Sequence, residues 1–316
     1  MLSIMDLKKL IIFQKHRGIF TLFCALSFTK ASYFSDISDK KISNIIKEVS
    51  SFLKKRKIES TSGLKRFFKK QHPYYFINWT LQHSDPPQFK RLYKKWEGEI
   101  PLKRYKSFGK LLRKFYFEAD IPQLWKRYQG TYSKEIKRYR KTPFLVIREA
   151  LSYLKIKKLP FKKIIFIPNF LDAIRAGYAH TIRDKVYITF GPSKNRVNTQ
   201  LLRHEFLHCI INPLVEKCDC YSYIIKGNKQ FLQKTISGIA RKYYDEPNAI
   251  SSEYILRAIE GRLLSSDKRK YYFKEQRMMG FPHIEFFDLQ LKNYEKSKKT
   301  FSEYLPIILK KIDGLK

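Results

Sequence analysis

The feature that most constrains this chain is the sequence His204-Glu205-Phe206-Leu207-His208, which has the pattern H-E-x-x-H. On a helix, residues four apart lie on the same face, so His204 and His208 can reach one metal ion. Glu205 lies about a quarter of a turn from His204, where its carboxylate can accept a proton from a water molecule at the metal. These three residues predict a metal site, with His204 and His208 as ligands and Glu205 as the catalytic base.

The surrounding sequence predicts that this helix is buried. Asn198 or Thr199 can cap its start, and Pro213 is expected to end it at Asn212. Between these points nearly every side chain is apolar, apart from Arg203 and the polar residues of the motif. Two imidazoles and a carboxylate are costly in a buried helix unless something satisfies them, and a metal ion does so. The alternative is a chance match with ordinary core histidines, and we favour the metal site.

Two positions are open for a third ligand. A histidine six residues after His208 would fit one common zinc pattern, but that residue is Leu214, and residues 220–244 contain no Asp, Glu or His. The next acids are Asp245, Glu246, Glu253 and Glu260, and the last two lie seven residues apart on one helix face with Arg257 between them. If neither Glu253 nor Glu260 serves, the third ligand is expected among His283, Glu285 and Asp288. We favour Glu253 because Arg257, one turn later, can hold its carboxylate in place, and Glu260 is the alternative.

The net charge of +37, from 65 Lys and Arg against 28 Asp and Glu, raises the possibility of a nucleic-acid partner. The basic residues are spread along the whole chain, so this role is possible but not favoured. One cluster, residues 65–70, interleaves basic and aromatic side chains and suits either base stacking or an amphipathic helix. The longer gaps in positive charge include 204–216, 243–256 and 278–291, and the first two contain the predicted ligands.

The pattern along the chain predicts an α+β fold. Residues 1–120 are expected to form a mainly α-helical N-terminal region, and residues 121–316 a zincin-like metallopeptidase region. In the second region we expect two helices over 121–155, a buried strand at 164–167 and a pair of strands over 176–190 that turns at Arg183-Asp184. The motif helix, a helix over about 228–243, a helix capped by Asn248, and two basic helices separated near Thr300 follow.

Two further segments bear on the compartment. Residues 18–28 are apolar but too short to span a membrane, and we interpret them as a buried helix rather than a signal peptide. The four cysteines, at positions 24, 209, 218 and 220, are too few for a disulfide scaffold and are interpreted as free thiols. We therefore expect a cytoplasmic protein without a transmembrane segment.

The H-E-F-L-H sequence followed by Asn212-Pro213, together with the later segment Ser252-Glu253-Tyr254-Ile255-Leu256-Arg257-Ala258, resembles gluzincin-type metallopeptidases. It is most similar to an uncharacterised family of H-E-F-x-H proteins in which a distant S-E-Y-I-x-R-A segment supplies a glutamate. The resemblance covers residues 120–316 and implies Zn²⁺ bound by His204, His208 and Glu253, with Glu205 as base.

The expected function is therefore hydrolysis of a peptide or protein substrate by a zinc-activated water. A donor to the developing oxyanion is also needed, and His283, Tyr178 and His180 are candidates by residue type. The alternative is a basic nucleic-acid-binding protein whose zincin core is structural or inactive.

Overall fold

A computed structural model of the chain describes residues 4–29, 44–69, 71–193, 197–218, 236–238, 240–242, 244 and 246–314. The structure is mixed α+β, mostly helical, as the sequence predicts. Its residues group into two compact units. The first unit comprises Met1–Lys8, Pro143–Pro160 and Leu202–Lys316, and the second unit comprises Lys9–Thr142 and Phe161–Leu201. Residue 120, the predicted boundary, lies inside the second unit because the helices on either side of it pack together.

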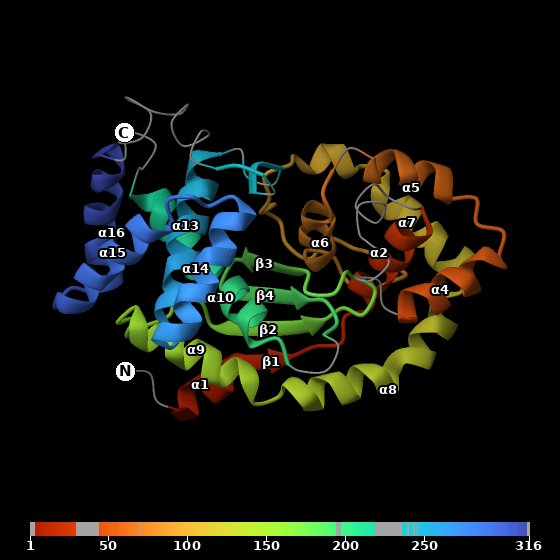
Figure 1. Cartoon of the computed structure of the whole chain (residues 1–316). Coiled ribbons are helices and arrows are strands. Elements are labelled where there is room, and N and C mark those ends of the chain that lie inside the picture. Colours follow the sequence, from red (N-terminus) through yellow and green to blue (C-terminus); the bar gives the residue numbers. More distant parts are fainter. Residues whose placement is uncertain are drawn as a thin grey trace. The chain divides into compact units, whose positions relative to one another are not determined.

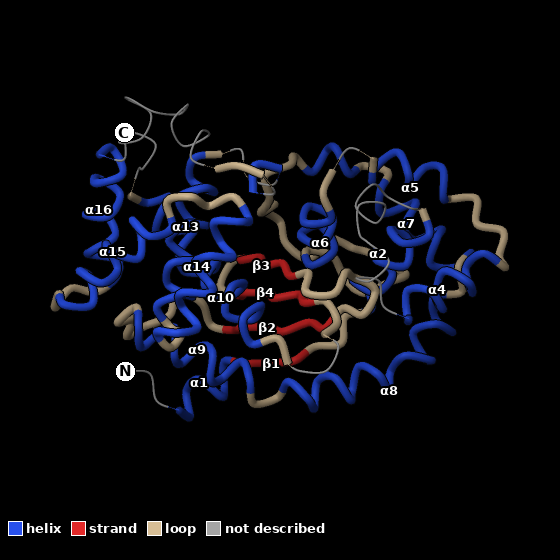
Figure 2. Tube along the Cα trace, in the orientation of Figure 1, coloured by secondary structure: helices blue, strands red, loops and turns tan. Residues whose placement is uncertain are grey.

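A four-stranded sheet is the framework of the second unit, with its strands in the order β1-β2-β4-β3 (Figures 1 and 2). The strands are β1 (Ile11–Phe13), β2 (Lys163–Pro168), β3 (Gly177–Ile182) and β4 (Lys185–Phe190). β1, β2 and β4 run parallel, and β3 pairs antiparallel with β4 through the predicted turn at Arg183-Asp184. The strands predicted at 164–167 and over 176–190 are thus confirmed.

The helices of the second unit pack around α2, whose residues 18–27 are all buried. The buried helix expected over 18–28 is therefore present. The helical elements of this unit are α2 (Arg17–Phe28), α4 (Asn44–Lys54), α5 (Thr61–Phe68), α6 (Pro73–Leu81), the 3₁₀ turn η2 (Leu102–Tyr105), α7 (Phe108–Glu118) and α8 (Ile121–Tyr139).

The basic and aromatic cluster that begins at Lys65 lies on α5, and its aromatic rings face inward. Phe68 is 1% exposed and packs edge-on against Phe76 and Phe108, and Phe67 packs against the same core. Rings buried in this way are not free to stack on nucleic-acid bases. The sequence allowed either a base-stacking cluster or an amphipathic helix, and the structure shows an amphipathic helix.

The first unit is helical. Its elements are α9 (Thr142–Tyr153), α10 (Thr199–Lys217), the 3₁₀ turn η3 (Ala240–Lys242), α13 (Pro247–Arg262), α14 (Ser266–Met279), α15 (Ile284–Lys296), α16 (Phe301–Lys310) and the 3₁₀ turn η4 (Lys311–Gly314). The short helix α1 (Ile4–Leu10), α9 and α10 each cross a boundary between the units. α13 packs against α14 and α15, and α15 packs against α16 (Figure 1).

Glycine fixes the end of α14. Gly280 has a φ of 107°, and a Cβ at this position would lie 1.8 Å from the carbonyl oxygen of Ser237. The glycine instead accepts a hydrogen bond from the Ser237 N–H at 3.1 Å. Only glycine tolerates both the left-handed conformation and this close approach, so α14 ends here and the chain turns into α15.

The motif helix α10 begins as expected, but it is longer than the sequence predicts. The Asn198 side chain accepts a hydrogen bond from the Leu201 N–H at 3.0 Å, which confirms the predicted cap. The expected end at Asn212 is wrong, because α10 continues through Pro213 to Lys217. Proline removes one helical hydrogen bond, but Ile211 and Val215, one turn apart, are both fully buried, and their burial favours continuing the helix.

Two other expectations about helix starts have different outcomes. α13 begins one residue before Asn248, whose side-chain oxygen has no hydrogen-bond partner among the described residues, so the predicted cap is wrong. Pro247 instead occupies the first turn, where its missing N–H costs nothing. The break near Thr300 is confirmed, because Thr300 and Glu303 form a capping box at the start of α16.

Three remaining expectations concern cysteines, a helix and membrane spans. Cys24, Cys209 and Cys218 are free thiols, whereas Cys220 and most of the helix expected over 228–243 lie outside the described residues. Within the described ranges, no helix combines the length and the apolar character that crossing a membrane requires.

Burial of His180 on β3 predicts a pH-dependent stability of the second unit. Its ring is 1% exposed and contacts Tyr74, neither ring nitrogen has a hydrogen-bond partner among the described side chains, and burial lowers its pKa to about 3. The folded state thus holds a neutral ring, whereas the unfolded chain takes up a proton near pH 6.5. Stability is lost as the pH falls from 6.5, by roughly 2 kcal/mol between pH 7.5 and 5 from this residue.

The substitution His180→Phe keeps an aromatic ring and removes this titration, so it should reduce the loss of stability toward pH 5. Part of the loss remains, because burial also lowers the pKa of His16 in the same unit to about 4. All three tryptophans lie in the second unit, so urea unfolding followed by tryptophan fluorescence reports on that unit. Parallel pH profiles of the wild-type and variant proteins would show that His180 does not carry the effect.

Candidate metal centre

The helix α10 presents the two motif histidines on one face, as their spacing predicts. His204 and His208 point their Nε2 atoms at each other across 3.2 Å, and their rings meet edge to face. Their side chains are 17% and 20% exposed, so the pair is reachable from solvent although the helix is otherwise largely buried.

Glu253 on α13 completes the set. Its Oε1 atom lies 3.1 Å from His208 Nε2 and 3.9 Å from His204 Nε2, and its side chain is 2% exposed. Ligand atoms about 2.0 Å from a tetrahedral zinc ion are roughly 3.3 Å apart, and the three separations are close to that value. These three residues could hold a metal ion. The sequence left Glu253 and Glu260 as candidates for the third ligand. Glu253 is the one whose carboxylate oxygen faces the Nε2 atoms of both histidines.

The Glu253 carboxylate is fixed by Arg257, one helical turn later, as predicted. Arg257 Nε donates to Glu253 Oε2 at 2.9 Å, which leaves Oε1 for the histidines. Arg257 also donates to Gln276 Oε1 on α14 at 2.7 Å and lies over the ring of Phe281. Burial alone would raise the pKa of Glu253, but the charges of Arg257, His204 and His208 outweigh it and hold that pKa well below its ordinary value.

The partners of the other two ring nitrogens determine the histidine tautomers. His204 Nδ1 lies 3.3 Å from Glu260 Oε2, and His208 Nδ1 lies 3.2 Å from Asn212 Oδ1. Glu260 Oε2 also accepts a hydrogen bond from the Tyr272 hydroxyl at 2.6 Å, so it acts as an acceptor. Each histidine therefore donates from Nδ1, and in the neutral ring the lone pair of Nε2 points at the other histidine.

With both rings neutral, the two Nε2 lone pairs and Glu253 Oε1 face one another and repel, and either a proton on one Nε2 or a metal cation between the three atoms relieves that repulsion. A carboxylate that accepts from one ring nitrogen while the other nitrogen binds metal is a common arrangement at zinc sites. The donor set of two imidazoles and one carboxylate is that of a catalytic zinc site with an open position. The residues present thus fit a zinc ion in both donor type and orientation.

Glu205 is 5% exposed, and its carboxyl lies within electrostatic range of the ligand set. Burial raises its pKa to about 7; His208 lowers it, and the carboxylates of Glu253 and Glu260 raise it further. A bound dication would favour the charged form of Glu205 and so lower that pKa. Glu205 is thus poised to hold or release a proton near neutral pH beside the ligands.

The candidate oxyanion donors belong to two different units. His283 precedes α15 in the first unit and is half-buried, and its N–H donates to the Tyr254 hydroxyl at 3.5 Å. Tyr178 and His180 lie on β3 of the second unit, and His180 is enclosed against Tyr74. Buried as it is, the His180 ring offers no surface to a substrate.

Sequence reasoning missed several residues that support the ligands, and one of them is Tyr244, whose side chain hydrogen-bonds with Glu253 and Arg257. Asn212 orients His208, Tyr272 holds Glu260, and Gln276 holds Arg257. Asn212 was recognisable in principle, because it follows His208 by four residues and shares its helix face. Tyr272 and Gln276 lie on the buried face of α14, but the sequence of this helix is strongly basic and its apolar stripe is too short to mark them.

No protein-family model, curated protein or solved structure matches this chain. The resemblance to gluzincin-type metallopeptidases therefore rests on the motif residues of the sequence alone.

The geometry predicts a ranking of zinc affinities. The wild-type protein should bind about one zinc ion, and the double substitution His204→Ala, His208→Ala should abolish binding. Glu253→Gln, which weakens a direct ligand, should lower the affinity more than Glu260→Gln, which disturbs only the partner of His204 and should cost about 10–100-fold. Competition with a chromophoric chelator measures these affinities.

A matched control is available on the exposed face of α14, where Glu275 can be changed to Gln with the same loss of charge and no ligand nearby. If Glu260→Gln strips the zinc while Glu253→Gln leaves it bound, the roles of the two glutamates are reversed.

Proposed function

We propose that this chain is a zinc-dependent peptidase of the gluzincin type, with a zincin-like catalytic region and a peptide or protein as its substrate. The observation that carries the proposal is the convergence of His204, His208 and Glu253 beside the buried carboxyl of Glu205. A purely structural zinc site usually has four protein ligands, whereas three ligands with a neighbouring base are typical of hydrolytic sites.

Each residue of the site has a separate role in the proposed amide hydrolysis. A bound zinc ion would supply a Lewis acid that polarises the scissile carbonyl and acidifies a water molecule. Glu205 accepts the proton from the attacking water as the carbon–oxygen bond forms, and then delivers it to the nitrogen of the leaving amine as the carbon–nitrogen bond breaks. Arg257 and Glu260 keep Glu253 and His204 in orientation throughout.

The buried position of Glu205 suits this role. A carboxylate in water, with a pKa near its ordinary value, is a weak base and takes a proton from water inefficiently. Burial strengthens the hold on the proton, and a nearby cation weakens it again, so the two effects bring the pKa toward the range in which a group can both take and give a proton.

The alternative, a basic nucleic-acid-binding protein with an inactive zincin core, is supported by the net charge of +37. The cluster that begins at Lys65 does not add to that support, because Phe68 is buried in the core and Phe67 is half-buried against it. Binding of nucleic acid that is sensitive to salt and indifferent to Glu205 would favour this alternative.

The decisive experiment compares the wild-type protein with Glu205→Gln on a peptide library derived from a whole proteome, with products read by mass spectrometry. Glutamine is nearly isosteric with glutamate but cannot accept the proton, so the variant should keep its zinc and its fold while hydrolysis falls by at least about 100-fold. Zinc content and thermal unfolding, measured on the same preparations, separate loss of chemistry from loss of structure.

Glu275→Gln, purified in the same way, is the control for contaminating peptidases and should cleave like the wild type. Equal turnover by the Glu205→Gln and wild-type proteins would exclude Glu205 as the base, and the absence of cleavage by zinc-loaded wild-type protein would contradict the proposed function.

A further inference from the structure

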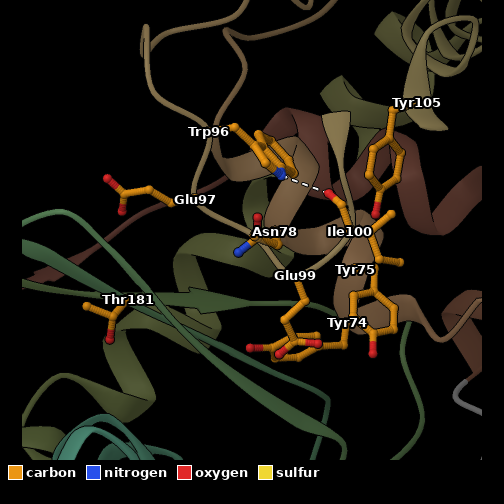
Figure 3. Close-up of a pocket in the computed structure, with 10 residues that line it drawn as sticks. Tyr74, Tyr75, Asn78, Trp96, Glu97, Glu99, Ile100, Tyr105 and Thr181 are labelled. Carbon is orange, nitrogen blue, oxygen red and sulfur yellow. Dashed lines mark hydrogen bonds between the residues drawn. The ribbon is translucent and has the colours of Figure 1, made fainter. Parts of the chain in front are cut away.

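A cavity of about 440 Å³ lies within the second unit, between the start of α6 and the loop that leads to η2 (Figure 3). Its volume is in the range of small-ligand sites. The lining residues are Tyr74, Tyr75, Asn78, Trp96, Glu97, Gly98, Glu99, Ile100, Tyr105 and Thr181. Four of these ten are aromatic, two are glutamates and none is Lys or Arg, in a chain with 65 such residues.

The loop that forms one wall is held in place by hydrogen bonds. The Trp96 indole N–H donates to the carbonyl of Ile100 at 2.8 Å. The Gln82 side chain on the adjoining turn accepts from the Glu97 N–H at 3.1 Å and donates to the Glu97 carbonyl at 2.6 Å. A Cβ on Gly98 would lie 2.9 Å from the Trp96 ring, so the indole can fold over the loop only because residue 98 is glycine. The cavity is therefore built into the loop rather than left between loose side chains.

The aromatic walls are also fixed against one another. Tyr74 and Tyr75 meet edge to face at 5.5 Å, and the rings of Trp96 and Tyr105 lie 5.9 Å apart. Tyr105 is 3% exposed and anchors the cavity to the core. The faces of aromatic rings carry partial negative charge, and several rings around one space attract organic cations.

The two glutamates differ in their partners. Glu97 accepts a hydrogen bond from the Arg183 N–H at 2.7 Å and lies 3.8 Å from the Arg183 guanidinium, so its charge is already compensated. Glu99 has neither a hydrogen bond nor an ion pair in the described part of the chain. Every other acidic residue described in the second unit has at least one of these. Glu99 is therefore the one described carboxylate of the second unit without a charged or hydrogen-bonding partner, although the chain has a net charge of +37.

We propose that this cavity is a binding site for an organic ammonium group, with Trp96 and the neighbouring tyrosines facing the cation and Glu99 supplying the opposite charge. A primary or methylated ammonium group is large enough to contact several rings. Its positive charge can pair with the carboxylate of Glu99. Anions are disfavoured, because two carboxylates and no basic side chain line the cavity. The site is separate from the proposed peptidase activity and does not depend on it.

Isothermal titration of the full-length protein with choline tests the proposal. Dimethylbutanol, the uncharged carbon isostere of choline, has the same shape without the charge, and acetate is the anionic control. Choline should bind and both controls should not. Glu99→Gln, on an exposed side chain, should weaken choline binding by at least about 10-fold, because it removes the only uncompensated charge of the site. Glu275→Gln makes the same chemical change in the first unit and should leave binding unchanged.

The aromatic contribution is tested by Trp96→Leu, which should weaken binding, against Trp96→Phe, which keeps a ring and should largely preserve it. Thermal unfolding shows whether each variant is folded. Capped lysine and capped trimethyl-lysine amides complete the ligand set. If they bind more tightly than choline, the natural ligand is a side chain of a peptide; if choline binds more tightly, it is a free small cation. Equal binding of choline and dimethylbutanol, undiminished binding by Glu99→Gln, or no binding of any ammonium compound would overturn the proposal.

Discussion

The charged residues of α13 are the constraint on which the first unit depends. Residues 250–261 of this helix are all buried, yet they include Glu253, Arg257 and Glu260. Removing one partner from a buried ion pair costs about 3–5 kcal/mol, because the remaining charge is left in a medium that solvates it poorly. Neighbours satisfy Glu253, Arg257 and one oxygen of Glu260, whereas Glu260 Oε1 has no hydrogen-bond partner among the described residues. The neighbours come from α10 and α14, so the charges of one helix dictate how three helices of this unit meet.

The same network explains why the site is suited to a cation and not only to hydrogen bonding. Arg257 compensates one oxygen of Glu253, and Glu260 and Asn212 take the Nδ1 protons of the two histidines. What remains is a set of three atoms, the two histidine Nε2 atoms and Glu253 Oε1, that lie within 3.9 Å of one another. A dication placed among these three atoms relieves their mutual repulsion. Arg257, Glu260 and Asn212 therefore contribute to the metal affinity, because they hold the three ligand atoms in place.

The sequence predicted the site better than the helices that carry it. His204, Glu205 and His208 follow from a spacing that geometry dictates, and Glu253 followed by elimination because few acids lie in this part of the chain. The boundaries were less accurate: burial of Ile211 and Val215 carries α10 past Pro213, and Asn248 lies inside α13 rather than at its cap. Local propensity cannot anticipate either result, because both depend on packing against residues far away in the sequence.

The contribution of α14 could not have been predicted at all. Its residues Tyr272 and Gln276 are recognised only once Glu260 and Arg257 are placed beside them. The aromatic cavity of the second unit could not have been predicted either. Its lining residues come from α6, a loop, η2 and β3, so no single stretch of sequence contains them.

The distance along the chain between His208 and Glu253 has a consequence for how proteins of this design can vary. A metal held by both residues would close a loop of 253 − 208 = 45 residues. The entropy of closing a loop grows only with the logarithm of its length, and doubling the length costs roughly 0.6 kcal/mol. The spacing between the two histidines is rigidly set by the helical turn, whereas the stretch before the glutamate can lengthen or shorten at little thermodynamic expense. Two related chains can thus share the same ligand cage and still differ widely in the number of residues that separate its two halves.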